Sequence, residues 1–197
     1  KEMLSHKKSL DILKKTNALI EGHFILSSGL HSPKYIQCAK LLSHPSMAQS
    51  ICKSLAFKIK KYFKNIDLIL APAMGGIIIG YEIGKLLKVE TIFCERVSGE
   101  FVLRRGFNIK KNCNVLIIED VITTGKSSIE CVKLIKKSKA NLLGFASIID
   151  RSSKRSLKIK DKIISHLKIN VPTFKKNNLP RSLKNTPITI PGSRYIK

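Results

Sequence analysis

Apolar residues in this chain form short continuous runs that alternate with stretches of helical spacing. The runs are typical of strands buried on both faces, and they lie at 66–71, 90–95, 115–118 and 142–149. Apolar residues that recur every third or fourth position predict helices over about 2–20, 45–63, 77–87 and 127–139. Because strands alternate with helices, the pattern predicts an α/β fold whose mostly parallel sheet is covered by helices on both sides.

Three regions depart from this alternation. Residues 24–37 predict short strands that are interrupted at 27–29 and again at Ser32-Pro33. A polar loop is expected after the strand at 90–95, as far as about Gly106. From Lys154 onward the chain is basic, weakly periodic and broken by Pro172, Pro180, Pro187 and Pro191. A chain of 197 residues is nevertheless expected to form a single domain.

The segment 115–128 combines a buried strand, two acids, a turn of small residues and the start of a helix. The unpaired N–H groups and the dipole at a helix N-terminus attract phosphate, so the turn at 123–127 is a candidate phosphate site. Glu119 and Asp120 would repel that phosphate, so they must serve vicinal hydroxyls or a divalent cation on the same ligand. The segment therefore predicts a site for a sugar phosphate.

Two other interpretations of this segment explain less. Gly125-Lys126-Ser127 looks like the second half of a nucleotide-binding P-loop, but that motif needs glycine five positions before Gly125, where this chain has Asp120. A plain connection between strand and helix explains Ser127 as an N-cap. This second interpretation does not explain why two charged residues, Glu119 and Asp120, lie at the end of a buried strand.

Segment 115–128 resembles the phosphoribosyl pyrophosphate signature of the type I phosphoribosyltransferases. Four further segments resemble those of the orotate phosphoribosyltransferases in that family. In chain order they are a base-binding segment at 22–35, a pyrophosphate loop at 71–76, a mobile catalytic loop at 93–107, and Asp150-Arg151. The resemblance implies the type I fold, with a core at about 45–152 and a hood built from about 1–40 and 155–197. It also implies transfer of a phosphoribosyl group to orotate, which gives orotidine 5′-monophosphate and pyrophosphate in pyrimidine biosynthesis.

The resemblance also implies roles for individual residues. Those expected to bind phosphoribosyl pyrophosphate are Met74, Gly75, Arg96, Glu119, Asp120, Val121, Ile122, Thr123, Thr124, Gly125, Lys126 and Ser127. Those expected to contact orotate are Phe24, Ser28, Tyr35, Thr123 and Arg151. Those expected to act in catalysis are Arg96, Arg104, Arg105 and Asp120. Mg²⁺ is expected to be held mainly through phosphoribosyl pyrophosphate, with no direct protein ligand, and the family implies a homodimer whose mobile loop reaches the partner's site.

The catalytic loop departs from the family pattern. Many members have a lysine directly after the arginine and further Lys or His within the loop, whereas here Val97 follows Arg96. Ser27 likewise stands where other members place a lysine that contacts the base. The remaining loop cations are Arg104 and Arg105. Arginine pairs well with departing pyrophosphate, but its pKa is too high for a proton donor, so we expect electrostatic assistance rather than acid catalysis.

Composition changes this picture little. The formal net charge of +24 favours anionic partners, but most lysines are scattered singly or in pairs and there is no tryptophan, so we expect no nucleic acid. The five cysteines form no Cys-x-x-Cys motif, which argues against a disulfide framework or a zinc site. We find no stretch long enough to cross a membrane and no signal-peptide core, and we expect a cytoplasmic protein.

Two alternative functions stay open. One is a phosphoribosyltransferase for another base, a purine or uracil. The other is a non-catalytic regulator that senses phosphoribosyl pyrophosphate and binds DNA, although the sequence contains no helix-turn-helix region. His23, His31 and His44 lack partners at metal-ligand spacing and are expected to be surface or capping residues.

Overall fold

The computed structural model describes residues 3–153 and 157–191. Its centre is a six-stranded sheet in the order β5-β4-β3-β6-β7-β8. The strands are β3 (Leu68–Pro72), β4 (Glu90–Val97), β5 (Glu100–Val102), β6 (Asn114–Ile122), β7 (Asn141–Asp150) and β8 (Ile163–Lys168). Neighbouring strands are parallel except for β5, which pairs antiparallel with β4 at the edge. The predicted α/β fold with a mostly parallel sheet is confirmed.

Helices cover both faces of this sheet, because the apolar side chains of each strand alternate between them. On β6, Leu116 and Ile118 pack with α3 (Pro45–Tyr62) and α4 (Gly75–Leu87). Val115 and Ile117 pack on the other face with α5 (Lys126–Lys137). The helices at 45–63, 77–87 and 127–139 therefore form close to their predicted bounds.

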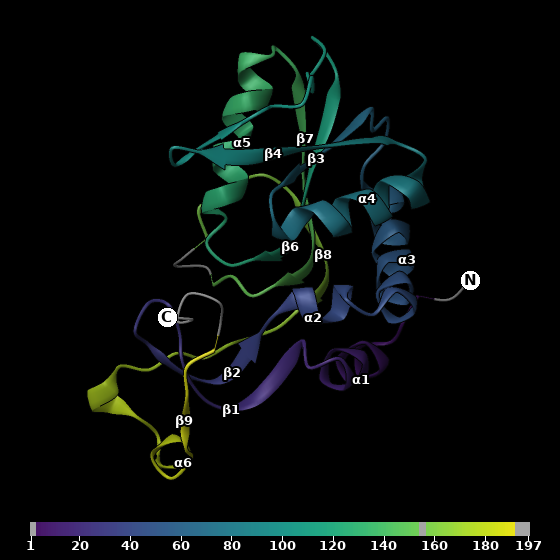
Figure 1. The fold of residues 1–197 in the computed structure, drawn as a ribbon. Helices are drawn as coiled ribbons and strands as arrows, with labels where there is room; N and C mark the ends of the chain where they lie inside the picture. The colour runs from purple at the N-terminus through teal and green to yellow at the C-terminus, as the bar shows by residue number, and fades with distance from the viewer. Residues whose placement is uncertain (1–2, 154–156, 192–197) are drawn as a thin grey trace.

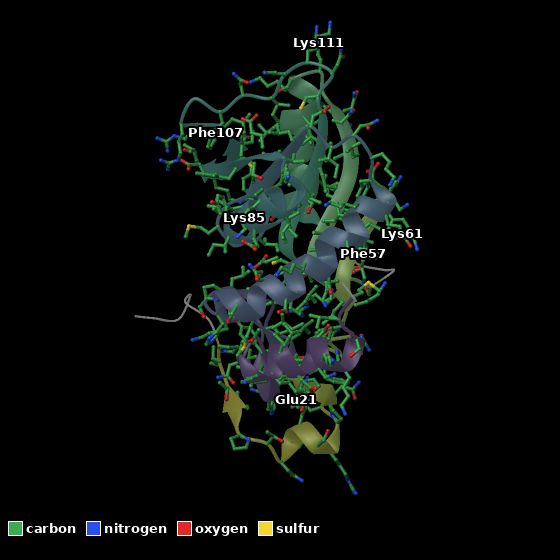
Figure 2. All side chains as sticks on the ribbon, turned by 90° about the vertical axis from the view of Figure 1, so that its right-hand side faces the viewer. Glu21, Phe57, Lys61, Lys85, Phe107 and Lys111 are labelled. Carbon is green, nitrogen blue, oxygen red and sulfur yellow. The ribbon has the colours of Figure 1, made fainter. Side chains whose placement is uncertain are left out.

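The two ends of the chain build a second, smaller layer, the hood, which lies below the core in Figure 1. Its sheet has the order β2-β1-β9. The hood elements are α1 (His6–Lys15), β1 (Leu19–Ile25), β2 (His31–Ile36), α6 (Arg181–Lys184) and β9 (Ile188–Thr189). A short helix, α2 (Cys38–Leu42), leads from the hood into the core. Figure 2 shows α3 lying between the core sheet and α1.

Several predicted bounds are wrong. The first helix ends at Lys15 instead of about residue 20, because the Thr16 hydroxyl bonds back to Ile12 and Asn17 takes a left-handed φ of 56°. Ser32-Pro33 lies inside β2 and does not interrupt it. The supposed polar loop after β4 contains β5, which returns along the same edge. The tail after residue 154 contributes β8, so the core sheet extends past residue 152.

Two histidines expected at the surface are buried. His23 on β1 and His31 on β2 are 2% and 4% exposed, and their Nε2 and Nδ1 atoms lie 2.7 Å apart. His23 Nδ1 also lies 3.1 Å from the carbonyl oxygen of Thr186, in the segment that leads to β9. The pair therefore fastens the β1–β2 hairpin to the C-terminal part of the hood.

In the described part of the chain, no helix is both long enough and apolar enough to pass through a bilayer.

Candidate active site

The carboxyl ends of β3, β4 and β6 meet at one edge of the sheet, which is where α/β proteins bind ligands. β3 leads through a turn into α4, and β6 leads through residues 123–125 into α5. Gly125 takes φ 75° at the start of α5, and a Cβ there would lie 2.6 Å from the side chain of Ile159. The left-handed φ and the close side chain both favour glycine at this position, in the turn that is predicted to bind phosphate.

The backbone of this turn is held by its neighbours. Thr124 accepts a hydrogen bond from Lys158 N through its carbonyl oxygen and one from Lys126 N through its hydroxyl. Thr123 and Lys126 are exposed, whereas Ser127 is half-buried. Val121 and Ile122 pack into the two hydrophobic clusters of the core, so they could serve a ligand only through their backbone.

The two acids lie within β6 rather than after it, and their side chains point to opposite faces of the sheet. Glu119 Oε1 accepts a hydrogen bond from the Ser128 hydroxyl on α5. Asp120 lies on the α4 side, and its Oδ1 accepts a hydrogen bond of 2.8 Å from Val121 N. Burial raises the pKa of both carboxyls, that of Glu119 to about 7. The Ser128 hydrogen bond opposes this rise at Glu119 and the charge of Asp120 adds to it.

The predicted pyrophosphate loop lies directly against the second acid. A Cβ on Gly75 would come within 2.7 Å of both Asp120 carboxylate oxygens. Met74, just before it, is 84% exposed and follows a cis peptide bond from Ala73. The structure therefore brings Met74, Gly75 and Asp120 together, as the sequence predicts.

The three arginines expected to act on pyrophosphate are paired with glutamates. Arg96 bonds to Glu130 on α5 and stacks on the Phe101 ring, 4.1 Å from its centroid. Arg104 and Arg105 both bond to Glu95, at 2.9 and 3.0 Å, one to each carboxylate oxygen. All three therefore lie close to β4, and none makes a hydrogen bond or ion pair with the acids of β6.

The residues expected to contact orotate come from two layers. The amide N of Arg151 donates to the carbonyl oxygen of Ile122, which places Arg151 beside the end of β6. Its Nε is buried and makes no hydrogen bond within the described residues. Burial lowers the pKa of Arg151, and the nearby Tyr35 of the hood opposes that shift. Phe24 packs against Tyr35 with ring centroids 5.8 Å apart. The structure thus brings Arg151 close to the hood aromatics.

Ser28 is placed differently. It lies in the exposed turn between β1 and β2, where its hydroxyl accepts a hydrogen bond from Leu30 N. No hydrogen bond joins it to Arg151 or to the other expected orotate contacts in the ranges that the structure describes.

Known proteins are similar to this chain in both sequence and fold. The phosphoribosyl transferase domain family matches residues 37–183. Orotate phosphoribosyltransferase of Parvibaculum lavamentivorans is 44% identical over 194 residues, which cover 98% of this chain and 100% of the relative. That of Chlorobium phaeobacteroides is 43% identical over 187 residues, or 95% of each chain. The chain belongs to the orotate phosphoribosyltransferase family. The crystal structure of the Aeropyrum pernix orotate phosphoribosyltransferase shares its fold, with a TM-score of 0.68 at 21% identity over 81% of this chain and 92% of that one.

Within this orotate phosphoribosyltransferase fold, sequence reasoning missed the partners of the predicted site residues. Ser128, the last residue of segment 115–128, and Glu130, two residues later, lie on α5, where they bond to Glu119 and Arg96. Glu95 precedes Arg96 and holds the two loop arginines. The only signal for Ser128 is that the first turn of α5 must face the end of β6. No spacing in the sequence indicates the ion pairs between Arg96 on β4 and Glu130 on α5, or between Glu95 on β4 and the two loop arginines.

Proposed function

We propose that this protein is an enzyme that transfers the phosphoribosyl group of phosphoribosyl pyrophosphate to orotate. The products are orotidine 5′-monophosphate and pyrophosphate, a step in the synthesis of UMP. One observation carries the proposal: Asp120 meets Gly75 beside the phosphate-binding turn, so acids, turn and pyrophosphate loop share one edge of the sheet. The 44% identity to a curated orotate phosphoribosyltransferase supports orotate as the base.

Phosphoribosyl pyrophosphate would lie across this edge. Its 5′-phosphate would accept hydrogen bonds from the N–H groups of residues 123–127, aided by the dipole of α5. Glu119 and Asp120 would accept hydrogen bonds from the ribose hydroxyls, which requires both to be ionised when the ligand is bound. The pyrophosphate group would lie against Met74 and Gly75, where the absence of a side chain at Gly75 lets an anion approach the backbone.

Orotate would bind between the hood and the end of β7. Its carboxylate suits the planar guanidinium of Arg151, whose buried Nε makes no other hydrogen bond among the described residues. Phe24 and Tyr35 would supply an aromatic surface for the pyrimidine ring.

The reaction needs placement and charge neutralisation more than a covalent nucleophile. A ring nitrogen of orotate forms a bond to C1 of the ribose and gives up its proton to the departing pyrophosphate or to solvent. The bond from C1 to pyrophosphate breaks in the same step, and positive charge develops on the sugar. Arg96, Arg104 and Arg105 would neutralise the departing group. Each pairs with a glutamate through only some of its five N–H donors, so pyrophosphate could bind beside the carboxylate or in its place.

Magnesium is part of the same proposal. Mg²⁺ prefers carboxylate and phosphate oxygens, and phosphoribosyl pyrophosphate would bring such phosphate oxygens to the site. Over residues 3–153 and 157–191, no group of three or more His, Cys, Asp or Glu side chains could hold a metal ion. Phosphoribosyl pyrophosphate would therefore supply most of the ligands, and the bound ion would neutralise charge on the leaving group.

A base screen tests the proposed reaction. Orotate, uracil, adenine and hypoxanthine are each incubated with phosphoribosyl pyrophosphate and Mg²⁺, and base consumption is followed by absorbance. We expect orotate alone to be consumed, and the Asp120→Asn variant to be much slower. Consumption of another base in place of orotate would identify a different phosphoribosyltransferase. Retention on DNA at physiological salt without any turnover would identify a regulator.

A homodimer also belongs to the proposal. The start of α4 exposes large apolar side chains next to the site: Met74 is 84% exposed, Ile78 57% and Tyr81 67%. Apolar groups gathered in this way favour contact with another protein surface. Sedimentation velocity should give a dimer for the native chain and a monomer for Tyr81→Glu. Tyr62→Glu on α3, where Tyr62 is 48% exposed, is the matched control and should stay dimeric.

We place the enzyme in the cytoplasm, with small-molecule substrates and without nucleic acid or membrane. All five cysteines are free thiols, which is the expected state in a reducing compartment.

A further inference from the structure

Ser128 is a polar residue with no exposure to solvent. It lies in the first turn of α5, and its side chain is completely buried. A serine inside a helix commonly bonds to the carbonyl one turn earlier in its own helix. The Ser128 hydroxyl instead crosses to β6 and donates to Oε1 of Glu119. A buried hydroxyl that leaves its helix in this way joins two elements of the proposed site.

Glu119 has few other polar neighbours. On its face of the sheet it interacts with the buried thiol of Cys131, which lies 3.4 Å from the Cys94 sulfur. Asp120 is the other acid whose charge acts on it. In the described part of the chain, Oε2 of Glu119 makes no hydrogen bond or ion pair. Ser128 therefore supplies the donor that fixes one oxygen and leaves the other available to a ligand.

We propose that Ser128 is a positioning residue, which holds Glu119 so that Oε2 accepts a hydrogen bond from a ribose hydroxyl. This inference rests on the proposed function of the site. The two acids differ in the group that donates a hydrogen bond to each carboxylate. Asp120 receives its donor from the backbone N–H of Val121, which no substitution of a neighbouring side chain removes. The orientation of the Glu119 carboxylate depends on a hydrogen bond from the Ser128 side chain, so it can be tested by mutation of Ser128.

Three variants separate positioning from general packing. Ser128→Ala removes the donor, and Ser128→Thr retains a hydroxyl at the same place. Ser138→Ala is the matched control, because Ser138 lies just past the other end of α5 and its hydroxyl donates to the carbonyl of Leu134 in the same helix. We expect Ser128→Ala to raise the KM for phosphoribosyl pyrophosphate about tenfold, the effect of losing one hydrogen bond to a charged group. The KM for orotate should change little, Ser128→Thr should restore most of the loss, and Ser138→Ala should match the native protein.

The pH dependence gives a readout that a purely structural role would not move. The Ser128 hydrogen bond lowers the pKa of Glu119 against the effect of burial. Removal of the hydrogen bond should raise the pKa of Glu119 further. As pH falls, Glu119 should therefore take up its proton, and binding of phosphoribosyl pyrophosphate should weaken, at a higher pH in Ser128→Ala than in the native chain. A lower melting temperature with an unchanged pH profile and unchanged KM would overturn the assignment.

Binding measured without the base keeps this test independent of the reaction. Calorimetric titration with phosphoribosyl pyrophosphate and Mg²⁺, from pH 6 to 8, needs no orotate. If the native protein binds it but consumes no orotate, the choice of base fails while a weaker Ser128→Ala complex still supports Ser128. If both proteins bind it equally at every pH, the role of Ser128 is refuted whatever base is used.

Discussion

The contact between Gly75 and Asp120 gives the sharpest test of the site. In Gly75→Ala, the new methyl carbon would lie 2.7 Å from both carboxylate oxygens, whereas ordinary contacts at a Cβ begin at 3.4 Å. The Asp120 carboxylate must therefore move by about 0.7 Å, the difference between these two distances, to restore an ordinary contact. Its Oδ1 accepts from Val121 N at 2.8 Å, so a retreat of this size brings the hydrogen bond to its geometric limit.

The expected effect on affinity follows from the ligand contact that is lost, because a displaced Asp120 carboxylate no longer reaches the ribose hydroxyl in the proposed complex. A hydrogen bond to a charged group contributes about 1.5–3 kcal/mol, which corresponds to roughly ten- to hundredfold in affinity. We expect Gly75→Ala to weaken binding of phosphoribosyl pyrophosphate by that factor, as measured by calorimetry and by kcat/KM. Thermal stability should fall by less than the weakened hydrogen bond alone would cost, because alanine at the start of α4 favours the helix over glycine by about 0.5–1 kcal/mol.

A double-mutant cycle decides whether Asp120 carries the effect. Asp120→Ala removes the carboxylate that the methyl group would displace. In that background, Gly75→Ala should have little further effect, so the two substitutions should be strongly non-additive. Equal effects of Gly75→Ala in both backgrounds would refute the reasoning and would mean that the methyl group blocks the ligand directly.

Three further predictions concern charged side chains. Arg151→Ala should raise the KM for orotate at least tenfold and that for phosphoribosyl pyrophosphate much less, and equal increases would contradict the assignment of Arg151 to the base. Arg104→Ala and Arg105→Ala should each lower kcat about tenfold in steady-state assays; an unchanged kcat in both would place neutralisation of pyrophosphate elsewhere. Burial raises the pKa of Glu119 from its ordinary 4.5 to about 7, so the folded protein binds this proton more tightly than the unfolded chain. The carboxylate should therefore destabilise the native protein as pH rises from about 4.5 to about 7, by at most about 3 kcal/mol, and Glu119→Gln should remove this pH dependence in denaturant titrations at pH 5 and 8.

The sequence predicts the parts of the fold that depend on local pattern. The strands at 66–71 and 115–118 were predictable because continuous apolar runs are buried on both faces of a parallel sheet. The helix at 45–63 was predictable from its apolar spacing. The site also follows from local chemistry, since a strand, two acids and a small-residue turn are consecutive in the chain.

Features that depend on tertiary pairing were missed. β5 has only three residues, and its turn places Ser98 and Gly99 at φ 51° and 87°, a geometry that a short polar stretch does not reveal. β8 lies in a basic, proline-rich tail and becomes a core strand only because β7 offers a free edge. The burial of His23 likewise depends on Thr186, a residue 163 positions away.

The histidine pair of the hood has a consequence for how the protein matures. The Thr186 carbonyl can only accept, so His23 must donate to it from Nδ1, which leaves its Nε2 as the acceptor for a proton on His31 Nδ1. This arrangement exists only after the segment from Thr186 to β9 has docked. The β1–β2 hairpin, which carries Phe24 and Tyr35, therefore completes this hydrogen bonding only after the C-terminal segment has been made.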